Sequence, residues 1–249
     1  MKVSENFLIH ISAVEKLMNF DRDVLDAAIS QIRSLKDKLI QHHKLDNPSL
    51  TADNTLKILE GIREHDSLRS RYNTIFNQAL VLLVSYFAAS VHDLFRQGIC
   101  EALKQDNDSK LLKEQIRITF GELKEANYNL HELAPDLLIQ LKDISFQDTQ
   151  SIKRSFSDYL EIEIEKTGKV NDIILGQACR HVIVHSGGVV DDKLIRQVSN
   201  ATPRQVKTTI VQGEQIQFTD SEVMHIAESM RSYINELSDK VYYKYKIND

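Results

Sequence analysis

One short segment of the chain combines an arginine with two histidines, residue types that together can cleave a phosphate ester. Arg180 stands directly before His181 and five residues before His185. Arginine presents a planar, permanently charged fork that fits phosphate oxygens, and histidine titrates close to neutral pH. The set could therefore cleave RNA through attack by a 2′-hydroxyl, with histidine moving the proton and arginine stabilising the phosphoryl oxygens.

The surrounding sequence places this set at the end of a helix. Residues 170–185 have a helical apolar pattern, and the glycine-containing residues 186–188 predict its end, because glycine accepts the left-handed conformation. At about 100° per residue, Arg180 and His185 lie roughly 140° apart around the axis. His181 and His185 are four residues apart and share a face. The negative end of the helix dipole favours a cation there and tends to raise a histidine pKa.

A purely structural interpretation of the same residues stays open. His185 would then cap the last carbonyls of the helix, and Arg180 would pair with a carboxylate from a neighbouring element. An arginine and a histidine at this spacing occur in many helices without any catalytic role.

The segment from Arg180 to His185 resembles the signature of the HEPN superfamily, which is an arginine, a polar residue, three variable residues and a histidine. The aliphatic run before the histidine and the glycine-containing turn after it also resemble the family. So does an early apolar helix around residues 81–94. The resemblance covers about residues 66–240, and the RiboL-PSP-like branch of the superfamily is the branch considered.

The resemblance implies a metal-independent endoribonuclease with no cofactor, used as a toxin or in anti-phage defence. Arg180 and His185 would be the catalytic pair with His181 beside them, and Arg180 and Ser186 would contact the RNA substrate. A homodimer through the motif helix is implied, with two motifs facing each other across a composite cleft. An antitoxin or other regulatory protein is a further expected partner. Because some members have lost catalysis, a non-catalytic HEPN module that binds or regulates a partner is the alternative function.

The composition limits the other classes of function. The net charge is -5 and the sequence pI is about 6.0, so no overall basic excess indicates a nucleic-acid binder, and RNA would need a local patch. Cys100 and Cys179 have no CxxC spacing, which argues against a disulfide framework and a zinc site. No HExxH, P-loop or GxGxxG pattern is present.

The scarcity of helix breakers, 8 Gly and 3 Pro, predicts an all-α protein with long helices. The resemblance implies that these helices form a multi-helix bundle of HEPN type. We expect long helices over residues 3–43 and 66–104, and a further helix over residues 110–126 with its apolar residues facing inward. A final helix should begin at Thr219, where Glu222 completes a capping-box pattern.

Two segments favour extended structure. Residues 207–211 and 215–218 flank a turn with Gly213 and predict a small β-hairpin before the last helix. Residues 161–165 alternate glutamate with isoleucine, which is typical of either a short strand or an exposed helix edge.

A chain of 249 residues is long enough for one large domain or two small ones. We expect an N-terminal helical hairpin, residues 1–64, and an HEPN-like helical domain, residues 65–249. The first residues lack the basic and apolar pattern of a secretory signal. The longest apolar stretch, Ala79 to Val91, is shorter than the roughly 20 residues of a membrane span. We therefore predict a cytoplasmic location and no contact with a membrane.

Overall fold

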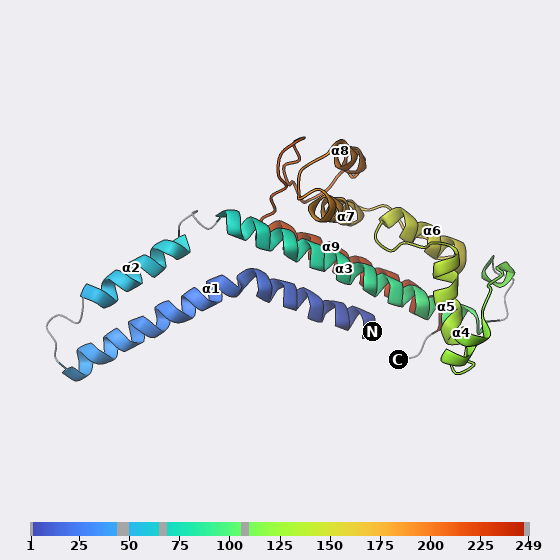
Figure 1. The fold of residues 1–249 in the computed structure, drawn as a ribbon, viewed down its shortest axis with the longest axis horizontal. Coiled ribbons are helices and arrows are strands. Elements are labelled where there is room, and N and C mark those ends of the chain that lie inside the picture. The colour runs from blue at the N-terminus through green and yellow to red at the C-terminus, as the bar shows by residue number, and fades with distance from the viewer. Residues whose placement is uncertain (1, 44–49, 65–68, 106–109, 247–249) are drawn as a thin grey trace.

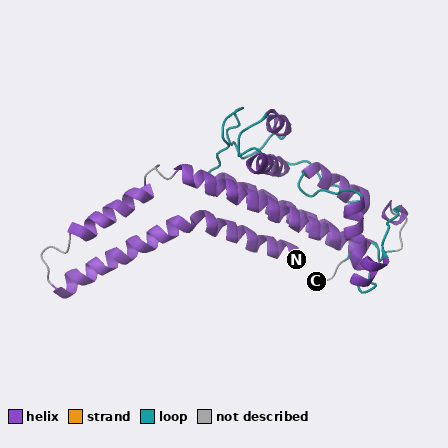
Figure 2. Cartoon of the chain, viewed as in Figure 1, coloured by secondary structure: helices purple, strands orange, loops and turns teal. Residues whose placement is uncertain are grey.

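The computed structural model describes residues 2–43, 50–64, 69–105 and 110–246. Helices dominate this part of the chain, and no strand occurs in it, which confirms the all-α prediction for these residues (Figure 2). In chain order the elements are α1 (Lys2–His43), α2 (Leu50–Glu64), α3 (Arg69–Ala102), a 3₁₀ turn (Lys110–Lys113), α4 (Phe120–Glu125), α5 (Leu130–Leu141), α6 (Thr149–Leu160), α7 (Gly168–His185), α8 (Asp192–Ser199) and α9 (Asp220–Tyr245).

The centre of the molecule is formed by α3 and α9, which lie side by side (Figure 1). Both α1 and α7 pack against this pair, and α5 and α6 pack against α3. The middle of α3 is apolar nearly all round, so it must be contacted from several directions. Its fully buried side chains include Leu80, Leu83, Phe87, Val91, Leu94 and Phe95.

The two halves of α1 have different surroundings. The first half contributes Phe7, Val14 and Met18 to the core that α3 and α9 share. The second half packs with α2 as a helical hairpin that extends away from the other helices (Figure 1). The expected boundary after residue 64 borders residues 65–68, which lie outside the described residues, so the division into two parts stays a prediction.

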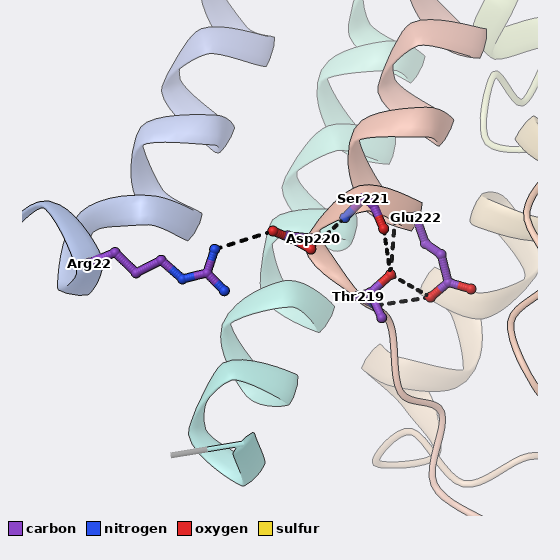
Figure 3. A network of polar contacts seen from close by, with 5 residues as sticks. All are labelled: Arg22, Thr219, Asp220, Ser221 and Glu222. Carbon is purple, nitrogen blue, oxygen red and sulfur yellow. Dashed lines mark hydrogen bonds and ion pairs between the residues drawn. The ribbon is translucent and has the colours of Figure 1, made fainter. Parts of the chain in front are cut away.

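The start of α9 is fixed by the capping box that the sequence predicted (Figure 3). The Thr219 hydroxyl accepts a hydrogen bond from Glu222 N at 3.2 Å, and the Glu222 carboxylate accepts one from Thr219 N at 2.9 Å. The exchange satisfies two N–H groups that a helix start otherwise leaves without partners. Next to it, Asp220 forms an ion pair with Arg22 of α1 at 3.3 Å. This exposed pair connects the start of α9 to α1, while the buried side chains of α1 provide most of the packing between them.

The predicted helix over residues 110–126 is wrong. Only the 3₁₀ turn and α4 form there, and Phe120, which was expected to face inward, is 89% exposed. The physical reason is a second capping box, in which Thr119 and Glu122 exchange the same two hydrogen bonds as Thr219 and Glu222. This box makes Phe120 the first residue of α4, so the residues before Thr119 do not belong to that helix.

The expected β-hairpin before α9 does not form a pair of strands. Residues 207–211 and 215–218 contain no strand, and the turn between them pairs with the loop after α7 instead. Val190 N donates to Glu214 O at 2.9 Å, and Gly213 N donates to Val190 O at 3.0 Å. Because this loop satisfies the backbone groups of the turn, the two arms are not joined by a ladder of their own. The contact fixes the loop that follows the end of α7.

By length and composition alone, α3 between Tyr72 and Ala102 is apolar enough to cross a membrane. The expectation drawn from the short run Ala79 to Val91 did not take the whole helix into account. A single such helix is weak evidence for a span, since the central helix of a bundle has the same composition. Here α3 is contacted by α1, α5, α6, α7 and α9.

The close approach of α7 to α3 and α9 depends on Gly176. A Cβ atom there would lie 3.1 Å from Ile226 Cγ2 and 3.6 Å from Leu80 Cδ1. We expect Gly176→Val to lower the free energy of unfolding by about 1–3 kcal/mol through overpacking, measured by urea unfolding followed by circular dichroism. Gly61→Val in α2 is the control, because a Cβ at Gly61 meets no described atom within 4 Å. Equal urea midpoints for the two variants would contradict this account of the packing.

Candidate active site

The helix α7 is buried along most of its length, and apart from Lys169 in its first turn its exposed polar side chains lie near its end. It starts at the N-cap Thr167, whose hydroxyl accepts a hydrogen bond from Val170 N. Most residues from Val170 to Val182 are buried, whereas His185 at the last position is exposed. The burial fixes the direction of the helix, so the side chains of its last two turns have defined positions at the surface.

The first turn of α7 also holds the segment that follows α8. Asp172 is buried, and its carboxylate accepts hydrogen bonds from Gln205 N and Val206 N, both at 3.0 Å. Asn171 Nδ2 donates to Pro203 O at 2.8 Å. These bonds attach the chain after α8 to the buried part of α7.

Arg180 is half-buried, and its guanidinium turns toward the start of α6. Its NH1 donates to Gln147 Oε1 at 3.3 Å. Among the described residues no carboxylate pairs with it, so the ion pair of the structural interpretation is not formed. The charge of the guanidinium is therefore available to an anionic ligand.

The two histidines share a face, as their spacing predicts. The ring centroids of His181 and His185 are 4.7 Å apart, and the ring planes are inclined by 49°. The imidazole of His185 makes no hydrogen bond with the described part of the chain, so it does not cap the helix. The cap is formed by the backbone, with Ser186 N donating to Val182 O at 2.9 Å. The imidazole of His185 is left free for other contacts.

Burial lowers the pKa of His181 below its ordinary value of 6.5, and the charge of Lys193 lowers this pKa further. Lys193 Nζ lies 3.5 Å from His181 Nε2. The charges of His185 and Arg180 act in the same direction, and Asp191 opposes them. The expectation that the helix dipole raises the pKa is wrong for His181, because burial and nearby cations outweigh the dipole. The lowered pKa favours the neutral form of His181 at pH 7, and the neutral imidazole can accept a proton.

Ser186 is exposed at the C-terminal cap of α7. Gly187 and Gly188 follow with φ angles of +61° and +81°, the left-handed conformation that the sequence predicted after this helix. Gly188 N donates to Val182 O at 3.1 Å, which closes the turn over the helix end. A contact between Ser186 and a substrate stays a prediction.

A cleft of about 600 Å³ opens beside the last turns of α7. Its walls are formed by α6, α7, α8 and the connector of residues 161–167 between α6 and α7. Arg180 and His181 lie in the wall, whereas His185 and Ser186 are not part of it. The connector has no regular structure, and its isoleucines are buried while its glutamates are exposed, so its alternation reflects neither a paired strand nor a helix edge.

The cleft is cationic, although the whole chain has a net charge of -5. Only two carboxylates line it, and that of Asp148 already caps α6 by accepting from Ser151 N at 2.7 Å. The four cations that line it form no ion pair with any carboxylate that the structure describes; they are Lys153, Lys166, Arg180 and Arg196. A local positive patch is therefore present beside Arg180 and His181.

The residues of this cleft outside the motif were not predicted from the sequence. Lys153, Lys166 and Arg196 come from three separate elements and share no spacing that a sequence pattern would reveal. Gln177 gave a signal that was overlooked, since it lies three residues before Arg180 and therefore on a neighbouring position of the same helix face. Its side chain is 7% exposed and lines the cleft.

Within the described ranges, no group of three or more His, Cys, Asp or Glu side chains is arranged to hold a metal ion. Cys179 is buried in the core, and burial raises the pKa of its thiol to about 12. Cys100 is half-buried, and neither thiol lines the cleft. The two cysteines are therefore not part of the candidate site.

Comparisons of the chain with protein-family models, with curated proteins and with solved structures found no match. The relation to the HEPN superfamily is therefore a resemblance of the segment from Arg180 to His185 and of its helical context. The chemistry open to the site follows from its own residues. A charged guanidinium and a neutral imidazole lie in the wall of a cationic cleft, with a second imidazole next to the first.

Replacing Lys193 should raise the pKa of His181. Removing the ammonium in Lys193→Gln removes a charge that opposes protonation of the imidazole, so more of His181 is protonated at any given pH near its pKa. NMR titration of the His181 Cε1–H resonance, assigned with His181→Gln, measures the change. Lys207→Gln is the control, because Lys207 is exposed and is not among the causes of the shift. An unchanged His181 pKa in Lys193→Gln would refute this account of the electrostatics.

Proposed function

We propose that the protein is a metal-independent endoribonuclease of HEPN type. The observation that carries the proposal is the position of Arg180 and His181 in the wall of a cationic cleft, with His185 in ring contact with His181. An unpaired guanidinium and a neutral imidazole are the groups that a metal-free cleavage of RNA needs. The resemblance of the segment to the HEPN signature supports the same activity.

In the proposed reaction, neutral His181 accepts the proton of a ribose 2′-hydroxyl. The 2′-oxygen attacks the adjacent phosphorus, and the bond from phosphorus to the 5′-oxygen breaks. Arg180 binds the non-bridging oxygens and stabilises the charge that develops on them. His185, beside His181, gives a proton to the leaving 5′-oxygen. The products are a 2′,3′-cyclic phosphate and a 5′-hydroxyl, and Ser186 contributes a hydroxyl for binding the substrate.

We further propose that the protein acts as a homodimer through the end of α7. Three exposed aliphatic side chains support this surface, Val184 at 46%, Val189 at 38% and Val211 at 44% exposure. They belong to the last turn of α7, to the loop after it, and to the segment that pairs with this loop. A second copy that covered them would bring two motifs together in one composite site. The biological role would be that of a cytoplasmic toxin or anti-phage effector, held in check by an antitoxin or another regulatory protein.

Purified protein should cleave single-stranded RNA in the presence of EDTA and leave 2′,3′-cyclic phosphate ends. Arg180→Ala, His181→Ala and His185→Ala should each lower kcat/KM by about 100-fold or more. The histidine variants each lose a group that transfers a proton, and Arg180→Ala loses the positive charge that stabilises the phosphoryl oxygens. Gel analysis of a labelled oligoribonucleotide, with mass spectrometry of the ends, measures both effects.

Arg117→Ala is a matched control, since Arg117 is exposed and does not line the cleft. Its activity should equal that of the wild type. Cleavage that EDTA abolishes, or that survives in His185→Ala, would contradict the mechanism. Absence of cleavage by the wild type would favour the non-catalytic HEPN module.

A further inference from the structure

We propose that the cleft between α6, α7 and α8 is a subsite that binds one unstacked nucleotide of single-stranded RNA next to the cleaved bond. The inference rests on the proposed function for the identity of the substrate. Lys153, Lys166 and Arg196 hold the phosphate of that nucleotide and the phosphates of its neighbours in the strand, and Gln177 donates to its base. These residues extend the site beyond the motif at the end of α7.

The charges of the cleft are placed for a strand rather than for a single ion. Lys153 lies on α6, Lys166 on the connector and Arg196 on α8, so the cations come from three different walls. Lys166 Nζ donates to Asn200 O at 2.9 Å, and Arg196 Nε donates to Asp192 O at 3.2 Å. These backbone contacts orient the side chains without neutralising them. Together with Arg180, they allow several consecutive phosphates to be bound.

The inner part of the cleft suits a base. Among the lining residues, Ile164 and Val170 are buried and Ile174 is half-buried, whereas Lys153, Lys166 and Arg196 are exposed. The cleft volume of about 600 Å³ lies within the range of sites that enclose small ligands, roughly 300–1,000 Å³. An apolar floor with a cationic rim matches a nucleotide, which has an apolar face and an anionic backbone.

A buried donor in the same wall lacks a partner. The Thr149 hydroxyl donates to Gln177 Oε1 at 2.7 Å, which fixes the amide, and Gln177 Nε2 has no hydrogen-bond partner. A buried polar group without a partner is unfavourable, so an acceptor from a ligand is expected at this point. A carbonyl oxygen of a base provides such an acceptor.

The substrate is single-stranded because only an unstacked base can enter the cleft. In an A-form duplex the bases are stacked and paired, whereas in single strands they can be splayed out and bound on their edges. A subsite of this kind binds the nucleotide on one side of Arg180 and His181, which would place the neighbouring 2′-hydroxyl and phosphate at the motif.

The test measures binding apart from cleavage. Fluorescence anisotropy follows a fluorescein-labelled ten-nucleotide oligouridylate bound to the full chain with His185→Ala, at salt concentrations from 50 to 200 mM. In that background, the triple variant Lys153→Gln, Lys166→Gln and Arg196→Gln is compared with a control triple variant of equal charge. The control carries Lys57→Gln, Arg117→Gln and Lys124→Gln, which are exposed and outside the cleft.

The cleft triple variant should bind at least about tenfold more weakly. Its salt dependence should also be shallower: the magnitude of the negative slope of log K against log salt should decrease by about 2, since each phosphate contact on a single strand contributes roughly 0.7. The control triple variant should bind as the His185→Ala protein does. A ten-base-pair RNA duplex should compete poorly. Equal urea midpoints for both triple variants establish that neither is misfolded.

Binding by the cleft triple variant equal to that of the control would overturn the inference, as would no binding by the His185→Ala protein or equal competition by the duplex. The proposed function is tested separately by cleavage of the same oligonucleotide with wild type. Cleavage by the wild type with unchanged binding in the cleft triple variant would leave the nuclease proposal in place and reject the subsite. Loss of binding without wild-type cleavage would support the subsite and reject the nuclease.

Discussion

The packing of α7 against α3 and α9 is the contact on which the candidate site depends. Gly176 permits the close approach, and the residues from Val170 to Val182 are mostly buried. Because Val170 to Val182 is mostly covered by its neighbours, the polar residues after Lys169 reach the surface mainly in the last two turns. Arg180 and His181 emerge into the cleft, and His185 emerges at the end of the helix. The position of the chemistry is thus a consequence of how the core is packed.

The long helices of the fold could be predicted from local sequence. The apolar residues of α3, the glycines after α7 and the capping box at Thr219 are local signals, and each predicted the element that the structure contains. The errors arose where a tertiary contact or an overlooked signal decided the outcome. The predicted hairpin does not form, because its turn pairs with the loop after α7. The prediction of one helix over residues 110–126 was wrong because it did not consider the capping box at Thr119, which starts α4.

The candidate site could be predicted only in its local part. The four-residue spacing of His181 and His185 predicted that they share a face, and their rings are in contact. The lowered pKa of His181 could not be predicted, because it results from burial and from Lys193 on another helix. The cleft could not be predicted from the sequence either, because its cations are brought together only when α6, α8 and the connector fold around α7. The net charge of -5 is a sum over the whole chain, so it does not indicate a local group of cations.

The central claim is that this helix end directs a ribose 2′-hydroxyl onto the neighbouring phosphate. It is tested most directly with an oligoribonucleotide in which one nucleotide, at a mapped cleavage position, carries 2′-deoxyribose. The account predicts that the wild-type protein no longer cuts after that nucleotide and still cuts at other positions of the strand. Unchanged cutting after the 2′-deoxy nucleotide would contradict the account, because no internal nucleophile would then be present at the cleaved bond.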